Sequence, residues 1–181
     1  MKSTVFILVA LLSIAYGQNY TEYISGCNHL RGTTVEYQIF TDEVFWAEAE
    51  SYCHDYLGGN LARIHNDETN TLILSYIESS GAGDAIATGF WIGLNDIRNE
   101  GVYVWSNGGE TCYGLDYIPW GNGEPNNNTK KDSNGQDCVQ LRKSMNWSWD
   151  DDYCSYRPKG FICEIPVCSD HHECNVCQDS V

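Results

Sequence analysis

Phe90-Trp91-Ile92-Gly93-Leu94-Asn95-Asp96 is a short, mostly apolar run that ends in two polar residues. Aromatic and branched residues in so short a run predict a strand. Val102 to Trp105 is a second strand candidate, and a polar turn separates the two. Helical patterns precede these strands, and further strand candidates follow them. This order predicts an α+β fold and not a wound βαβ pattern.

Two upstream segments carry apolar residues at helical spacing. The first stripe consists of Phe45, Trp46, Ala49, Tyr52, Cys53 and Tyr56, and Gly58-Gly59 should end its helix. The second stripe consists of Thr69, Leu72, Ile73, Tyr76 and Ile77, between a cap at Asn66-Asp67-Glu68 and a break at Gly81 to Gly83. Further strands are expected at Val35 to Phe40, Val139 to Leu141, Met145 to Trp149 and Phe161 to Glu164.

Between the strand candidates, Ser106 to Gln136 is rich in Gly, Asn, Pro and Asp. A loop of about thirty residues is uncommon inside a compact domain and usually has a function. Side chains with hard oxygens gather in and near it: Asp96, Glu100, Glu124, Asn126, Gln136, Asp137, Asp150, Asp151 and Asp152. Ca²⁺ prefers mixed carboxylate and amide oxygens, whereas zinc favours His and thiolate. The loop is therefore either a calcium site or a solvated acidic segment that aids solubility.

The charge and the N-terminus restrict the partner and the compartment. The chain has 181 residues and a formal net charge of −15, which argues against nucleic acid as a partner. Residues 1–17 contain Lys2, an apolar run from Val5 to Ile14 and small residues before Gln18, which predicts a cleaved signal peptide. The run is too short to span a membrane. We therefore expect a secreted protein whose nine cysteines form a disulfide framework.

Three N-glycosylation triplets begin at Asn19, Asn127 and Asn146, and they are relevant because we expect the protein to be secreted. Catalysis is not expected, because the chain has no GxSxG or HExxH motif and none of its five histidines has a recognisable acid–base arrangement around it. Trp120 and Trp147 lie near the acidic segments, where they could stack on a sugar ring or belong to the core. We favour the core.

Three motifs and four cysteines resemble the C-type lectin family. Trp91-Ile92-Gly93-Leu94 is similar to its WIGL strand, Glu124-Pro125-Asn126 to its EPN motif and Trp149-Asp150-Asp151 to its WND motif. The cysteines at its four invariant positions are Cys53, Cys138, Cys154 and Cys163. The resemblance implies the C-type lectin-like α+β fold, with two helices, two small antiparallel sheets, a long calcium-binding loop and the disulfides Cys53–Cys163 and Cys138–Cys154. We expect a polar arm at 18–26, this domain at 27–165 and a cysteine-rich tail at 166–181.

The resemblance also implies calcium-dependent sugar binding. Its principal calcium site would consist of Glu124, Asn126, Gln136, Asp150 and Asp151, with Pro125 in a cis peptide bond, and its second site of Asp96, Glu100, Asn127 and Asp137. Two sugar hydroxyls would join the calcium shell and exchange hydrogen bonds with Glu124, Asn126, Gln136 and Asp150. The EPN motif points to mannose, fucose or N-acetylglucosamine on glycans or glycoproteins, as in innate defence. The alternative is a protein-binding or structural module in which calcium only stabilises the loop.

The chain departs from the family pattern in the principal site. Gln136 stands where the family usually has Glu, and Asp150 where it usually has Asn. The two changes cancel in charge, so we expect calcium binding to be kept. Because Gln136 can donate a hydrogen bond, galactose stays open as a ligand. The loop is also longer, with fourteen positions from Glu124 to Cys138 where the family commonly has about ten.

Five cysteines fall outside the family's disulfide pairs: Cys27, Cys112, Cys168, Cys174 and Cys177. The tail also holds His171 and His172, so a zinc site is an alternative there, but disulfides suit an oxidising compartment better. An odd number of cysteines in a secreted protein suggests a bond between chains, and hence a covalent homodimer. Two copies would strengthen the binding of a weak sugar site.

Overall fold

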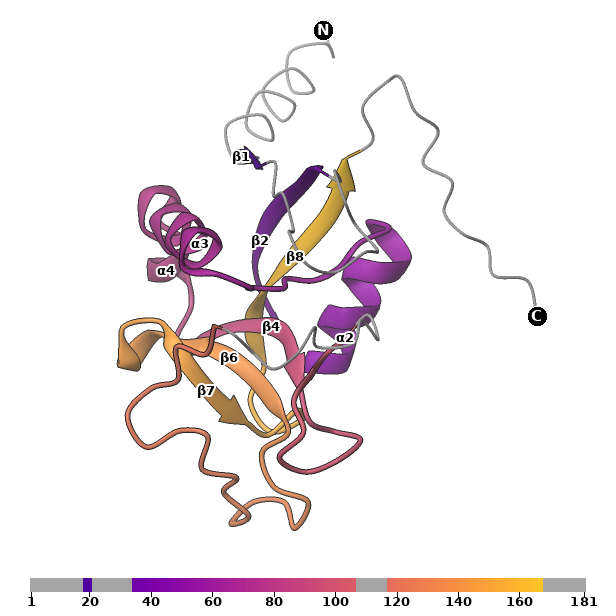
Figure 1. The fold of residues 1–181 in the computed structure, drawn as a ribbon, viewed down its shortest axis with the longest axis vertical. Coiled ribbons are helices and arrows are strands. Elements are labelled where there is room, and N and C mark those ends of the chain that lie inside the picture. The colour runs from indigo at the N-terminus through magenta and orange to yellow at the C-terminus, as the bar shows by residue number, and fades with distance from the viewer. Residues whose placement is uncertain (1–17, 21–33, 107–116, 168–181) are drawn as a thin grey trace, which may run out of the picture.

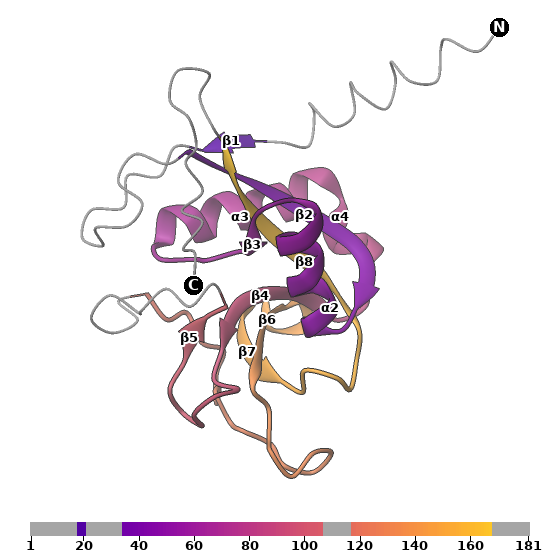
Figure 2. The same cartoon turned by 90° about the vertical axis from the view of Figure 1, so that its right-hand side faces the viewer.

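The computed structural model describes residues 18–20, 34–106 and 117–167, and the structural statements below concern these residues. Their strands form one sheet in the order β1-β2-β8-β4-β6-β7, with β3 beside β8 and β5 beside β4 (Figures 1 and 2). The strands are β1 (Gln18–Tyr20), β2 (Thr34–Val44), β3 (Asn60–Leu61), β4 (Gly89–Asn95), β5 (Val104–Trp105), β6 (Cys138–Arg142), β7 (Ser148–Asp152) and β8 (Lys159–Val167). Within these ranges, no helix is both long and apolar enough to cross a membrane.

The sheet is mixed because two antiparallel groups meet at its middle. Phe90 and Trp91 of β4 pair in parallel with Gly160 and Phe161 of β8, and every other strand pairing is antiparallel. The α+β class is thus confirmed, but the two separate sheets that we expected are joined by this short parallel pairing. The expected polar arm also begins as a strand, since β1 pairs with β2.

Helices cover both sides of the long β2–β8 pair. Figures 1 and 2 show α3 (Asp67–Ser80) on one side and α2 (Trp46–Ser51) on the other. The first helix continues from α2 into a π-helical turn, η1 (Tyr52–Tyr56), and two short helices, α4 (Ala82–Ala85) and the 3-10 turn η2 (Lys143–Met145), complete the set.

The predicted helix signals act as expected, with one difference. Asn66 caps α3 by accepting a hydrogen bond from the backbone N–H of Thr69 at 2.7 Å, and Gly81 ends the helix with a φ of 74°. In the first helix, by contrast, Tyr56 is 78% exposed, so the buried face is narrower than the predicted stripe. Its buried members are Trp46, Ala49 and Cys53.

One predicted strand boundary is wrong. Met145 lies in η2 and not in a strand, and β7 begins only at Ser148. The reason is local, because Asn146 and Trp147 have φ values of 53° and 63°, which an extended strand cannot accommodate. This turn places the three consecutive aspartates of the chain at the end of β7.

Disulfides and tryptophans fix the core around this sheet. The predicted bonds Cys53–Cys163 and Cys138–Cys154 are both present, and they tie η1 to β8 and the start of β6 to the segment after β7. Trp120 is half-buried and packs edge-on against the core residue Trp149 with ring centroids 5.7 Å apart, which agrees with the core role that we favoured. The same holds for Trp147, which packs against the core cluster. The signal peptide, the cysteine-rich tail and the cysteines at 27, 112, 168, 174 and 177 lie outside the described residues.

Candidate functional site

Three carboxylates from two distant segments meet at the end of β7. Glu124 comes from the long loop, and Asp150 and Asp151 come from the strand; one oxygen from each lies within 4.8 Å of the others. Burial, together with the two neighbouring aspartates, raises the pKa of Glu124 to about 7. Burial also raises the pKa of Asp150. Carboxylates so close repel one another, and a hard divalent cation would relieve this repulsion.

Asp151 holds the loop in register with the strand. Its two carboxylate oxygens accept hydrogen bonds from the backbone N–H groups of Asn126 and Asn127, at 2.9 and 2.6 Å. The side-chain amide of Asn126 in turn donates to the carboxylate of Glu124. The peptide bond between Glu124 and Pro125 is cis, as the resemblance implied. The EPN motif is therefore fixed against β7 by the acid cluster itself.

Two residues of β6 that we did not predict hold Asp150. Arg142 Nη1 donates to Asp150 Oδ1 at 3.0 Å, and Gln140 Nε2 donates to Asp150 Oδ2 at 2.6 Å. Gln140 is the direct cross-strand partner of Asp150. Gln140 and Arg142 are two positions apart and share one face of β6, so the alternation of a strand was the available signal. The sequence does not reveal the β6–β7 strand register, which brings these two side chains to Asp150.

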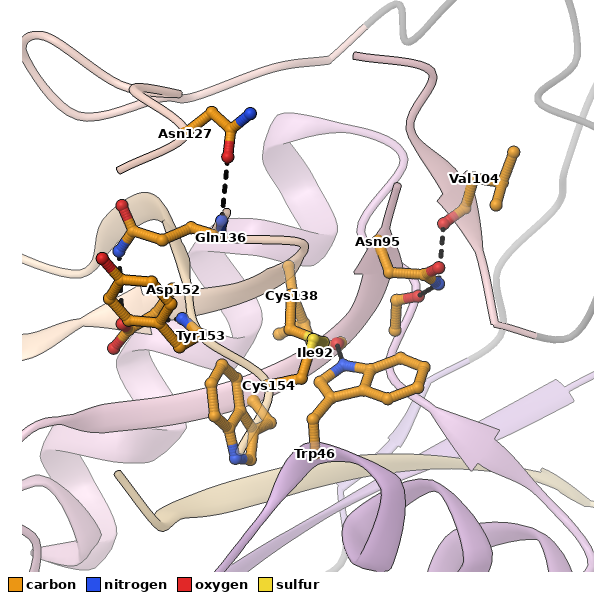
Figure 3. The surroundings of a disulfide bond; sticks show 12 residues. Trp46, Ile92, Asn95, Val104, Asn127, Gln136, Cys138, Asp152, Tyr153 and Cys154 are labelled. Atoms are coloured by element: carbon orange, nitrogen blue, oxygen red, sulfur yellow. Dashed lines mark hydrogen bonds between the residues drawn. A yellow bond between two sulfur atoms is a disulfide. The ribbon is translucent and has the colours of Figure 1, made fainter. Parts of the chain in front are cut away.

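The side-chain amide of Gln136 contacts the loop and the last residue of β7. Its Oε1 accepts from the backbone N–H of Asn128 at 2.9 Å, and its Nε2 donates to Asp152 Oδ1 at 3.2 Å (Figure 3). Of the five predicted principal ligands, the structure thus brings Glu124, Asp150 and Asp151 together with Asn126 beside them. The amide of Gln136 is instead engaged with Asp152.

Asp152 connects this network to a buried lysine. Lys159 is fully buried, its Nζ donates to Asp152 Oδ2 at 2.7 Å and it lies 4.4 Å from the centroid of the Trp91 ring. Gln140 Nε2 donates to the same carboxylate oxygen at 3.1 Å. A continuous chain of charges and amides therefore runs beneath the acid cluster. A lysine in a Pro-Lys-Gly sequence is expected at the surface, which is why this one was not predicted.

The predicted second site is partly assembled. Asp96 is buried, its Oδ2 accepts from the backbone N–H of Gly101 at 2.7 Å and its Oδ1 has no hydrogen-bond partner among the described residues. Burial raises the pKa of Asp96 to about 6, and the carboxylates of Glu100 and Asp137 add to this effect. A buried carboxylate oxygen without a partner is a position that a bound cation would satisfy.

Asn127, the fourth predicted member of that site, has its side-chain oxygen engaged. Asn127 Oδ1 accepts from the backbone N–H of Gln136 at 2.9 Å (Figure 3). The side chain packs against Gly135, where a Cβ would lie only 1.6 Å from that oxygen. Among the glycosylation candidates, Asn127 is thus folded into the loop, whereas Asn146 is exposed and Asn19 lies in β1.

An open groove of about 460 Å³ adjoins the acid cluster. The loop, β6, β7 and the segment after β7 form its walls. Its lining residues include Asn126, Asn128, Lys130, Lys131, Gln136, Gln140, Arg142, Asp150, Asp152, Tyr153, Tyr156 and Arg157. Because Asn126 and Asp150 also belong to the cluster around Glu124, a ligand at that cluster would extend into the groove.

Comparison with known proteins places this site in a known kind of domain. Residues 42–165 match the family model described as "Lectin C-type domain". The C-type lectin mannose-binding isoform of Oxyuranus scutellatus is 32% identical over 130 residues, which cover 71% of this chain and 75% of that protein. Lectin BRA-3 of Megabalanus rosa is 35% identical over 133 residues, which cover 72% and 71%. Among solved structures, the cow C-type carbohydrate-recognition domain of CD23, crystallised in the presence of GlcNAc2Man3 oligosaccharide, is 27% identical with a TM-score of 0.59 over 75% of this chain and 90% of that one.

Proposed function

The chain belongs to the C-type lectin family, and on that premise we propose that it is a secreted, calcium-dependent lectin that binds glycans or glycoproteins. The observation that carries this proposal is the meeting of Glu124, Asp150 and Asp151 within 4.8 Å beside an open groove. Three carboxylates and nearby amide oxygens match the donors that Ca²⁺ prefers. The protein's part is binding alone, with no bond broken.

In the proposed principal site, Glu124, Asp150 and Asp151 would hold the ion, and Asn126 and Gln136 would supply further amide groups. The ion supplies a centre at which two neighbouring sugar hydroxyls bind. The carboxylates would accept hydrogen bonds from those hydroxyls, and the amide NH₂ groups would donate to them. In the proposed second site, Asp96, Glu100 and Asp137 supply the carboxylates, with Asn127 as a fourth ligand if its oxygen leaves the backbone of Gln136.

The sugar class that we propose is mannose, fucose or N-acetylglucosamine, through the EPN motif. The similar domain of cow CD23 was solved in the presence of a GlcNAc2Man3 oligosaccharide, which supports this choice. Gln136 can donate a hydrogen bond where the family's usual Glu can only accept one, so galactose is the competing sugar to compare with mannose. A Gln136→Glu, Asp150→Asn double variant should keep calcium binding and sharpen the mannose preference on a glycan array. An unchanged array profile would remove the role given to these two residues.

The main experiment measures calcium and glycan binding together. The purified protein is passed over mannose and galactose resins with calcium and then eluted with EDTA, and calcium binding is measured by calorimetry. Glu124→Gln should weaken both, whereas Asp42→Asn, an exposed carboxylate on β2, should change neither. Calcium binding without retention of any glycan would favour the alternative of a protein-binding module. Absence of both would overturn the proposal.

Secretion and a covalent homodimer complete the proposal. Cleavage before Gln18 predicts that the mature protein begins there, which mass spectrometry of secreted material would measure. The five cysteines outside the two observed disulfides predict a dimer on a non-reducing gel that reduction converts to the monomer. A monomer on both gels would remove the dimer and leave the lectin proposal in place.

A further inference from the structure

The groove beside the acid cluster gathers positive charge in a strongly acidic protein. The chain has ten Lys and Arg residues and a net charge of −15, yet four of these cations line this one groove. They are Lys130, Lys131, Arg142 and Arg157.

The negative side chains of the groove are already paired. Asp150 forms an ion pair with Arg142 at 3.0 Å, and Asp152 forms one with Lys159 at 2.7 Å. Among the described residues, no ion pair involves the other three cations, Lys130, Lys131 and Arg157, and all three are exposed. Among the residues that line the groove, cationic side chains therefore outnumber carboxylates by four to two.

The loop insertion presents two of these cations on a fixed backbone. The buried Tyr153 donates its hydroxyl hydrogen to Asn128 Oδ1 at 3.0 Å and accepts from the backbone N–H of Lys131 at 3.2 Å. Asn128 Oδ1 also accepts from the backbone N–H of Lys130 at 2.9 Å. The extra residues of the loop are thus docked on the segment that follows β7, which lowers the entropic cost of using their side chains.

The ring of Tyr156 lies near two of these cations, Lys131 and Arg157. Lys131 Nζ lies 5.4 Å from the centroid of the Tyr156 ring, and the guanidinium carbon of Arg157 lies 5.5 Å from it. Cations within about 6 Å of an aromatic ring are attracted to its face. An ammonium and a guanidinium thus share one aromatic neighbour at the groove, and each can donate charge-assisted hydrogen bonds to an anion.

We propose that this groove is a subsite for an anionic substituent, a sulfate or a carboxylate, on the sugar residue next to the one at the principal site. This inference rests on the proposed glycan-binding function, because Asn126, Gln136 and Asp150 belong to both the principal site and the groove. The groove's volume of about 460 Å³ lies within the ordinary range of ligand pockets, roughly 300–1,000 Å³. The protein would therefore select acidic glycans over neutral ones with the same core.

The test compares three matched oligosaccharides: a neutral one, the same one with a sulfate and the same one with a carboxylate. With calcium present, at least one anionic form should bind the full chain about tenfold more tightly than the neutral form. The preference should shrink as salt rises from about 50 to about 500 mM, because exposed cations are screened. The comparison of the two anionic forms tells which substituent the groove takes.

Charge-removing and charge-keeping variants make the test specific. Lys130→Gln with Lys131→Gln, and separately Arg157→Gln, should abolish the preference and leave affinity for the neutral glycan within about twofold. Lys130→Arg with Lys131→Arg should retain it. Equal binding of neutral and anionic glycans by the unaltered protein would overturn the subsite while the lectin function stands. Failure to bind any of the three glycans would instead overturn the proposed function.

Discussion

Replacing Lys159 by Met tests whether the buried ion pair supports the site. Lys159 is fully buried, and the side chain of its partner Asp152 is only 15% exposed. Met keeps most of the apolar stem beside Trp91, so the main loss is the ammonium group. Removing one partner of a buried ion pair commonly costs about 3–5 kcal/mol, because the other charge is left without compensation.

The structure places the expected loss at the lower end of this range. After the change, Asp152 keeps hydrogen bonds from Gln136 Nε2 at 3.2 Å, from Gln140 Nε2 at 3.1 Å and from the backbone N–H of Tyr153 at 2.8 Å. These three donors and the partial exposure lead us to expect a loss of about 3 kcal/mol in the free energy of unfolding. Asp152→Asn should cost less, since burial already lowers the pKa of Lys159 and so reduces the cost of leaving its amine without a carboxylate partner.

A double-mutant cycle isolates the pair. The free energy of unfolding is measured in urea for the wild type, Lys159→Met, Asp152→Asn and the double variant, with calcium and with EDTA. We expect the double variant to be about 1 kcal/mol less stable than Asp152→Asn alone, which corresponds to a coupling energy of about 2 kcal/mol. Lys143→Met is the control, because among the described residues Lys143 Nζ donates to the carbonyl of Ile86 at 3.2 Å and to no carboxylate, and it should cost about 1 kcal/mol. Additive losses, with coupling below about 0.5 kcal/mol, would refute the reasoning.

Three further predictions concern the loop, the core and the glycosylation sites. Gly135→Ala should lower the free energy of unfolding by about 2–3 kcal/mol, because φ is 100° and the new Cβ would displace Asn127 Oδ1. Gly58→Ala is the control, since Gly58 has a φ of 66° and its new Cβ would meet no atom within 4 Å, so this variant should show only the backbone strain. Equal losses in the two variants would contradict the clash at Gly135. Burial lowers the pKa of His65 to about 4, so the unfolded chain binds its proton first and stability is lost as pH falls from 6.5 toward 4. Urea unfolding at both ends of this window should show a loss up to about 3 kcal/mol larger for the wild type than for His65→Gln, and parallel pH dependences would exclude this role. Glycopeptide mass spectrometry should find the exposed Asn146 modified and the folded-in Asn127 unmodified; the reverse would show that the loop opens before glycosylation.

The sequence predicted residues that act through local patterns. Glu124, Asp150 and Asp151 belong to short motifs whose side chains suit a cation in almost any arrangement, and the Asn66 cap depends only on neighbours in the chain. Gln140 could not be assigned, because its role depends on which residue of β7 stands opposite it.

Tertiary burial decides the roles that the sequence could not reveal. Lys159 is charged and follows Pro158, so nothing local indicates that β8 places it beneath Trp91. Met145 shows the converse, since its strand pattern is overridden by the positive φ values of the next two residues. Long-range packing thus determines the position of Lys159, and local backbone geometry determines that of Met145.

The charge balance of the proposed calcium site explains how this chain tolerates an aspartate at position 150. Glu124, Asp150 and Asp151 carry a formal charge of −3, and the guanidinium of Arg142 beside Asp150 reduces it to −2, which one divalent cation neutralises. The glutamine at position 136 offsets the extra negative charge of Asp150 in the total for the ligand set. Arg142 offsets that charge in space, because its guanidinium lies beside the Asp150 carboxylate. Arg142 therefore has little charge left for a ligand in the groove. It follows that discrimination of anionic glycans should depend on the lysines of the loop insertion and on the arginine beside Tyr156, and not on Arg142.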